Sequence, residues 1–153
     1  MATLKQTYNT SGTGTLTIAS LANGSGRCST AIDNTSGVYI TADIGLKIKT
    51  NAAGTSATGY VSVYLVRSYD GTSYDDAFAG TDAAFTPVNA TLIGTINAVA
   101  NATTYYKTID LAELGLTLPK KWAIAIVNSS GAALDSTGGS HEFKYTEKYY
   151  TIV

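Results

Sequence analysis

The most informative part of the sequence is residues 59–76, which read Gly59-Tyr-Val-Ser-Val-Tyr-Leu-Val-Arg-Ser-Tyr-Asp-Gly-Thr-Ser-Tyr-Asp-Asp76. The first half alternates with period two, which places Val61, Val63 and Leu65 on one face of a strand. β-Branched and aromatic residues dominate, as a pleated, half-buried surface favours. The run breaks at Asp70-Gly71, a dipeptide typical of tight turns because glycine tolerates positive φ. The pattern predicts a strand, a tight turn and an exposed loop after the turn.

Comparable patterns recur along the chain. They predict further strands at residues 13–21, 27–33, 38–49, 90–99, 103–111, 120–128 and 141–153. The alternation is most regular in the third of these, with Val38, Ile40, Ala42, Ile44, Leu46 and Ile48 on one face. Residues 120–128 are apolar on both faces around Trp122, which predicts a central strand. In the last strand, Phe143, Tyr145 and Tyr149 alternate with Lys144, Lys148 and Tyr150.

The segments between these strands are also informative. Residues 90–99 and 103–111 are expected to pair through the short connection at 100–102. Residues 77–87 contain two phenylalanines and a proline, and we expect an ordered loop there. Residues 111–116 are the one helical candidate, about one turn long.

About eight short strands with almost no helix predict an all-β protein, either a sandwich or a closed barrel. We favour an antiparallel, jelly-roll-like β-sandwich. The expected organisation is an extended N-terminal arm over residues 1–12, followed by a single β-sandwich domain over residues 13–153.

Composition narrows the functional classes. The 153 residues carry a net charge of −1 and only 14% charged residues, so no basic stripe is available for nucleic acid. No apolar run reaches membrane-spanning length, and the N-terminus lacks an apolar export signal, so we expect synthesis in the cytoplasm and no membrane contact. Cys28 is the single cysteine, which excludes an internal disulfide, and we expect a buried thiol.

The sequence offers little for catalysis. The single histidine, His141, has Ser140 and Glu142 as neighbours, but adjacent strand residues point to opposite faces and cannot form a triad. One histidine and one cysteine do not supply an ordinary zinc ligand set. Gly12-Thr-Gly14 opens a strand and lacks the third glycine of a dinucleotide site. We therefore expect no enzyme activity and no cofactor.

Four aspartates form the only acidic cluster: Asp70, Asp75, Asp76 and Asp82. A carboxylate pair could hydrolyse glycosides, but the general acid needs a cleft that raises its pKa. A calcium loop would need alternating Asp positions and a bidentate Glu, which are missing. We favour the third interpretation, in which these aspartates form turns and cap loops.

Tyrosine is abundant, with eleven copies. Tyr69 and Tyr74 flank the Asp-Gly turn, and Tyr149 and Tyr150 lie near the C-terminus. Adjacent tyrosines on a strand point to opposite faces, so one of each pair lies outside the core. Outward tyrosines suit both protein interfaces and sugar-stacking platforms.

Several segments, taken in order, resemble a known family. They are Gly26-Arg-Cys-Ser-Thr-Ala-Ile-Asp-Asn34, residues 39–49, Val63-Tyr-Leu-Val-Arg-Ser-Tyr-Asp-Gly-Thr-Ser-Tyr74, Gly80-Thr-Asp82, Leu92-Ile-Gly-Thr-Ile96 and Leu118-Pro-Lys-Lys-Trp-Ala-Ile-Ala-Ile-Val-Asn-Ser-Ser-Gly-Ala-Ala-Leu134. Together they resemble the small structural proteins of tailed-bacteriophage virions, in which jelly-roll head-decoration (cement) proteins are a common form. The resemblance covers most of the chain after the arm, and it implies no catalytic residues.

Two functional hypotheses follow. The resemblance implies a decoration protein on the capsid surface, with the major capsid protein as partner and a homotrimer as its assembly. The residues we expect to contact the partner are Leu4, Tyr8, Tyr69, Tyr74, Tyr149 and Tyr150. The alternative is a carbohydrate-binding module or adhesin on a phage tail or fibre, with Tyr69, Asp70, Tyr74, Asp75 and Asp76 holding a glycan.

Overall fold

The computed structural model describes residues 2–37 and 39–153; Val38, the expected start of one strand, lies outside the described residues. Eleven strands and two 3-10 turns follow one another along these described residues. They are β1 (Leu4–Tyr8), β2 (Gly12–Thr13), β3 (Gly26–Cys28), β4 (Ile32–Asp33), β5 (Thr41–Lys49), β6 (Tyr60–Ser68), η1 (Asp75–Ala77), β7 (Ala83–Ala84), β8 (Thr91–Asn97), β9 (Thr104–Asp110), β10 (Lys121–Ser129), η2 (Gly138–Ser140) and β11 (Glu142–Ile152).

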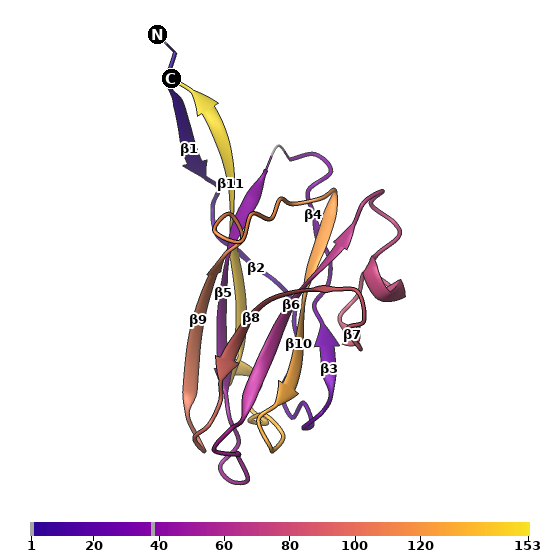
Figure 1. The fold of residues 1–153 in the computed structure, drawn as a ribbon, viewed down its shortest axis with the longest axis vertical. Coiled ribbons are helices and arrows are strands. Elements are labelled where there is room, and N and C mark those ends of the chain that lie inside the picture. Colours follow the sequence, from indigo (N-terminus) through magenta and orange to yellow (C-terminus); the bar gives the residue numbers. More distant parts are fainter. Residues whose placement is uncertain (1, 38) are drawn as a thin grey trace.

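The strands form two antiparallel sheets that pack face to face (Figure 1). One sheet has the order β1-β11-β5-β9, with β2 paired to β11; the other has the order β7-β3-β10-β6-β8, with β4 paired to β10. Without β1 and β7, and with β3 and β4 taken as one interrupted strand, this is the strand order of an eight-stranded jelly roll. The predicted antiparallel β-sandwich with almost no helix is confirmed.

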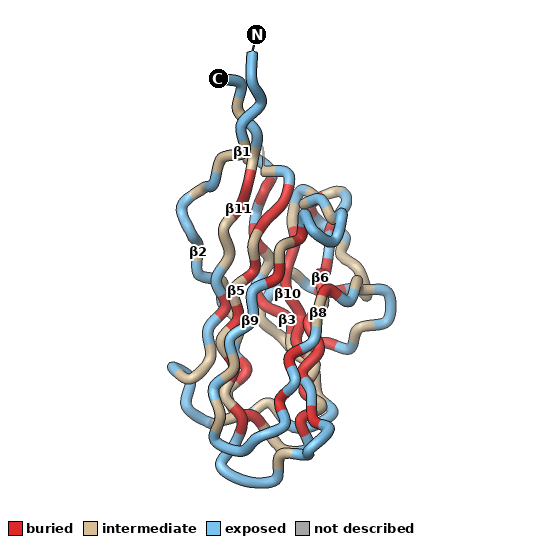
Figure 2. Tube along the Cα trace, turned by 60° about the vertical axis from the view of Figure 1, so that its left-hand side comes forward, coloured by how far each residue is buried: buried red, intermediate tan, exposed pale blue. Residues whose placement is uncertain are grey.

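The main core fills the space between the sheets, where the buried residues concentrate (Figure 2). Val61, Val63 and Leu65 of β6 are fully buried there, as their alternation predicts. Ala42, Ile44, Leu46 and Ile48 of β5 are likewise buried, and they belong to the same core cluster as the β6 residues. Ile40 is exposed although the same pattern places it on the buried face, because it precedes the first residue of β5.

Strand β10 is buried on both faces, as its sequence predicts. Trp122, Ile124 and Ile126 point into the main core, whereas Ala123 and Ala125 belong to a second apolar cluster on the outer side of the sheet. Two phenylalanines of the 77–87 loop cover that second cluster: Phe78 and Phe85 pack edge to face, with ring centroids 5.9 Å apart. This loop is therefore ordered by its aromatic anchors, as expected.

Two predicted strands are interrupted. In residues 13–21 only Thr13 is part of a strand, because the backbone N–H of Thr17 donates to Asp82 Oδ2 at 3.0 Å and makes no ladder bond there. In residues 27–33 the strand is broken into β3 and β4 at Ser29. The Ser29 hydroxyl accepts a hydrogen bond from the backbone N–H of Ile124 at 3.1 Å and so replaces a backbone acceptor.

The expected pairing of residues 90–99 with 103–111 is wrong, because β8 and β9 belong to different sheets. Their connection crosses the end of the sandwich and is fixed by Thr50, whose hydroxyl donates to Ala100 O at 2.6 Å and accepts from Thr103 N at 3.0 Å. The helical candidate at 111–116 is a single hydrogen-bonded turn, closed by Leu116 N donating to Leu111 O at 2.9 Å.

Residues 4–8 of the expected N-terminal arm form β1, which pairs with the last residues of β11 from Leu4 opposite Ile152 to Tyr8 opposite Lys148. We call residues 3–8 with 148–153 the terminal ribbon. It projects from one end of the sandwich and carries both chain ends (Figure 1). Among the described residues, no helix has the length and apolar character needed to cross a membrane.

Candidate binding sites

On one face of the terminal ribbon most side chains are apolar, whereas the other face mixes Lys5, Thr7 and Thr151 with Tyr149 and Val153. Residues directly opposite each other in an antiparallel pair share a face, and successive residues alternate. The register therefore places Leu4 with Ile152, Gln6 with Tyr150 and Tyr8 with Lys148 on one face. Leu4, Tyr8, Tyr150 and Ile152 are all exposed there. An apolar row of this kind, left in water, is typical of an interaction surface.

The outer edge of β1 offers backbone hydrogen bonds as well. Thr3 and Val153 exchange two backbone bonds of 2.9 Å, which makes Lys5 and Thr7 the next residues bonded to β11. The N–H and C=O groups of Leu4, Gln6 and Tyr8 therefore point away from β11, and no described strand lies beyond β1. An open edge without proline or a bulge is a template for a further strand.

Buried charges fix the base of the ribbon. Lys148 is only 3% exposed, and its Nζ lies 2.5 Å from Asp43 Oδ1 and 2.8 Å from Asp110 Oδ2. Burial opposes the charged form of Lys148, but its hydrogen bonds to Asp110 and Asp43 outweigh that effect and raise the pKa of the ammonium group. The Tyr8 ring covers Nζ, with the ring centroid 5.6 Å away. The apolar face therefore begins at a rigid anchor.

The other face of the ribbon base contains Glu147 and Tyr149. Tyr149 packs edge to face on Tyr39, with centroids 5.8 Å apart, so it is partly covered by the body of the protein. Glu147 is buried, and the side chain of Asn9 donates to its Oε2 at 3.4 Å. Burial raises the pKa of this carboxyl group above its usual value.

A pocket of about 360 Å³ lies where β6 ends and β10 begins. Figure 1 shows that these two strand ends are at the end of the sandwich from which the ribbon projects. This volume is at the lower end of the roughly 300–1,000 Å³ range of small-molecule sites. The turn and loop after β6 form one wall, and residues 117–119 before β10 form the other. The pocket therefore joins two loops that are about 50 residues apart in the sequence.

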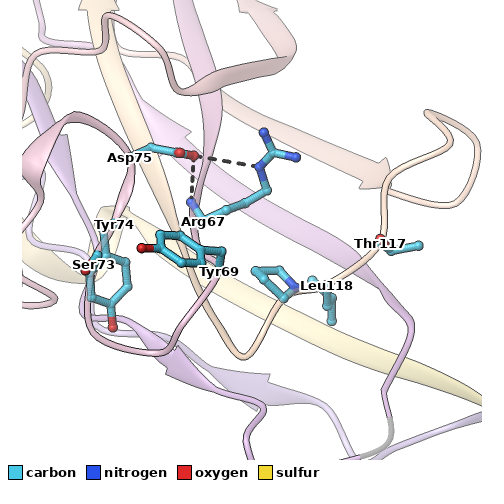
Figure 3. A pocket seen from close by; sticks show the side chains of 8 residues that line it. Arg67, Tyr69, Ser73, Tyr74, Asp75, Thr117 and Leu118 are labelled. Atoms are coloured by element: carbon cyan, nitrogen blue, oxygen red, sulfur yellow. Dashed lines mark hydrogen bonds and ion pairs between the residues drawn. The ribbon is translucent and has the colours of Figure 1, made fainter.

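Tyr69 is the most exposed aromatic residue of the pocket, with 81% of its surface accessible. In Figure 3 its ring lies between the Arg67–Asp75 pair and Tyr74, with Thr117 and Leu118 on the opposite wall. Tyr74 is held in place by Phe78, edge to face at 5.3 Å between centroids. The ring of Tyr69 is therefore open to a ligand, whereas the ring of Tyr74 is packed on Phe78 and forms part of the pocket wall.

Asp75 is the acidic residue that lines the pocket. Its Oδ2 accepts a hydrogen bond from the backbone N–H of Arg67 at 3.0 Å and lies 3.7 Å from Arg67 Nε. No hydrogen bond to a described residue uses the two terminal nitrogens of the guanidinium group, and none uses Asp75 Oδ1. The pocket therefore contains hydrogen-bond donors and an acceptor that are free to meet a ligand.

The other three aspartates of the cluster have structural roles. Asp70 accepts bonds from the backbone N–H groups of Ser73 and Thr72, and these hold the pKa of its carboxyl group well below the usual range. Asp76 accepts from three backbone N–H groups at residues 88–90. Asp82 forms an ion pair with Arg27 at 2.6 Å. Here the interpretation as turn and loop caps agrees with the structure.

The structure therefore groups the expected contact residues in two places. Leu4, Tyr8 and Tyr150 share the apolar ribbon face, and Tyr149 lies on the opposite face. Tyr69, Tyr74 and Asp75 line the pocket, whereas Asp70 and Asp76 point into their own loops. Three parts of these sites were not expected from the sequence: Ile152, Arg67 and residues 117–119. Arg67 is two residues before Tyr69 on an alternating strand, and that spacing was the available signal.

His141 and Cys28 belong to neither place. His141 is fixed by its ring nitrogens, with Nε2 2.9 Å from Asp135 O and Nδ1 accepting from the backbone N–H of Lys49 at 3.4 Å. Cys28 is fully buried, and that burial raises the pKa of its thiol to about 12. Within residues 2–37 and 39–153, no group of three acidic, histidine or cysteine side chains is placed to hold a metal ion.

No protein-family model matches the sequence, and no curated protein matches it. Among solved structures, the chain is similar to the C-terminal CBM6 of LamC, a marine laminarinase from Zobellia galactanivorans, at 10% identity over 95% of this chain and 99% of that one, with a TM-score of 0.41. It is also similar to the clostridial cysteine protease Cwp84 (14% identity, 95% and 33% coverage, TM-score 0.39) and to the VP2 subviral particle of infectious bursal disease virus (10%, 99% and 32%, TM-score 0.33). At these values the likeness carries no argument about function.

Proposed function

We propose that the protein is a non-enzymatic structural component of a bacteriophage virion, which decorates and stabilises the outside of the capsid. The observation that carries this proposal is the terminal ribbon, which holds an exposed apolar row (Leu4, Tyr8, Tyr150 and Ile152) away from the sandwich. The resemblance of the sequence to virion decoration proteins names the partner, the major capsid protein.

The ribbon has the properties of a docking element. A two-stranded ribbon alone is only marginally stable in water, and this one is anchored to the body at its base through Lys148. Contact with a partner would bury its apolar face, and the open edge of β1 would pair with an extended segment of the capsid protein. The burial of the apolar face and the pairing of the β1 edge both stabilise the bound state alone, which favours a role in assembly.

We further propose a homotrimer on the particle. A decoration protein meets many identical sites on a symmetric shell, so a closed oligomer would engage several of them at once. Linked contacts raise the overall affinity well above that of a single ribbon, by about 10²–10⁴-fold in favourable geometry. Light scattering at several concentrations would measure the oligomeric state in solution, and cross-linking on capsids would measure it on the particle.

The test is co-sedimentation with capsids assembled without this protein. Changing Leu4 and Ile152 together to aspartate removes two residues of the apolar face, and we expect binding to weaken by more than about tenfold. The matched control changes Lys5 and Thr151 to aspartate on the opposite face, and binding should be retained. Equal binding by both variants, or by a chain that lacks residues 1–10, would refute the role of the ribbon.

The pocket favours a second candidate function, carbohydrate binding. Its specific support is Tyr69, a highly exposed ring beside free hydrogen-bonding groups, which is a suitable platform for a sugar ring. A glycan array would test this proposal. Binding that disappears on Tyr69→Ala would support it, and an array without any bound glycan would refute it.

A further inference from the structure

From the charges and contacts of the pocket, we infer that its ligand is a neutral hexose unit, stacked on Tyr69 and held through adjacent hydroxyl groups by Arg67 and Asp75. The inference rests on the proposed carbohydrate function and gives the chemical class of the ligand. It assigns separate roles to the three side chains.

Tyr69 offers an exposed aromatic face on which a sugar ring can stack. Tyr69 exposes 81% of its surface and has no aromatic partner among the described residues, whereas Tyr74 packs on Phe78. One side of a hexose ring presents C–H groups, and these pack against the face of an aromatic ring as other apolar groups do. The opposite wall, with Leu118 and Pro119, adds apolar contact.

The charges that line the pocket favour a neutral ligand. Arg67 and Asp75 are the charged residues that line the pocket, and they form an ion pair with each other. Their charges cancel, so the pocket has little net attraction for a phosphate or a carboxylate. The nearby Asp70 is fully engaged in its own turn and does not face a ligand. A neutral ligand therefore fits better than an acidic one.

The free hydrogen-bonding groups of Arg67 and Asp75 suit a pair of hydroxyl groups. The terminal guanidinium nitrogens of Arg67 are donors only, and Asp75 Oδ1 is an acceptor only. A hydroxyl group both donates and accepts, so two adjacent hydroxyls can satisfy this donor and this acceptor at the same time. The backbone N–H of Arg67 fixes the Asp75 carboxylate through a bond of 3.0 Å to Oδ2, and the 3.7 Å ion pair keeps the guanidinium group beside it.

The test is an NMR titration of the full chain with methyl glucoside, methyl mannoside and methyl galactoside, each compared with the matching hexuronide. We expect at least one neutral glycoside to bind and to shift the amide signals of residues 67–75 and 117–119. The matching hexuronide should bind no more tightly. Tyr69→Ala should weaken binding by at least tenfold, whereas Tyr69→Phe, which keeps the ring, should stay within about threefold.

Two controls keep the outcomes distinct. Tyr106→Ala removes another highly exposed tyrosine, on β9 and outside this pocket, and binding should not change. Arg67→Met and Asp75→Asn should each weaken binding. Tenfold tighter binding of a hexuronide, or glycan binding that survives both Tyr69→Ala and Arg67→Met, would overturn the inference and leave carbohydrate binding in place. The absence of binding to any glycoside here and to any glycan on the array would overturn both.

Discussion

Replacing Lys148 with methionine tests how the base of the terminal ribbon is held. The substitution keeps most of the volume of a side chain that is 3% exposed, and it removes the ammonium group bonded to both Asp43 and Asp110. Hydrogen bonds to charged groups contribute about 1.5–3 kcal/mol each. The two aspartate side chains are 30% and 27% exposed and regain water once the lysine is gone, so we take the lower end. We expect a loss of about 3 kcal/mol in the free energy of unfolding.

The assay is thermal and urea unfolding followed by circular dichroism. A loss of this size in a domain of this length lowers the melting temperature by about 6–12 °C. The matched control is Lys144→Met on the same face of β11, because Lys144 is 53% exposed and pairs with Glu142 at 3.0 Å. A surface pair of that kind contributes less than about 1 kcal/mol. Equal effects of the two substitutions would refute the reasoning.

The pH dependence gives an independent check. The pKa of Lys148 is raised, so its contribution is complete below its ordinary value of 10.5 and is lost as the pH rises through the folded-state value. Burial opposes the charge of Asp110, but the hydrogen bond from Lys148 lowers its pKa, so its contribution is present above 3.8 and is lost as the pH falls. The difference between wild type and Lys148→Met should therefore be constant from about pH 5 to 10 and shrink at both extremes.

Three further predictions concern buried residues. Glu147→Gln should raise the free energy of unfolding by about 1 kcal/mol at pH 7 and leave it unchanged near pH 4. Burial raises the pKa of the carboxyl group, so the favourable contribution of Glu147 is lost as the pH rises. Urea unfolding at both pH values measures the difference. Cys28 should react with a thiol reagent only after unfolding, because it is buried and its pKa is about 12; absorbance with and without denaturant shows this. Gly59→Ala should lower the free energy of unfolding by about 1–3 kcal/mol, because a Cβ there would lie 2.6 Å from Ser130 O. Thermal unfolding measures this loss, and an unchanged melting temperature would contradict the close packing at Gly59.

The sequence could predict the faces of the strands but not their partners. Val61, Val63 and Leu65 are buried as their alternation requires, and Trp122 lies in a strand covered on both sides. Alternation reports which face of a strand is apolar, and both sheets of a sandwich satisfy the same pattern. That is why β8 and β9, close in sequence and each well patterned, were expected to pair and instead lie in opposite sheets.

The candidate sites depend on contacts between residues far apart in the sequence. The apolar ribbon face needs Leu4 opposite Ile152, and neither short segment contains a signal for the other. In the sequence Lys148 is only one of the residues that alternate with Phe143, Tyr145 and Tyr149, yet in the structure aspartates from β5 and β9 flank its ammonium group. In the pocket, the Asp-Gly turn predicted the position of Tyr69, but the opposite wall comes from residues 117–119, whose pattern gave no indication of it.

The pairing of Thr3 with Val153 has a practical consequence for protein engineering. A purification tag or a displayed peptide attached to either end would emerge beside the apolar row and would obstruct the docking that we propose for that face. The connection between β5 and β6 lies at the opposite end of the molecule, and its residues Ala52 and Ala53 are exposed (Figure 1). A peptide inserted at that tip would leave both chain ends clear and would point away from the apolar row, which makes this loop the better fusion point.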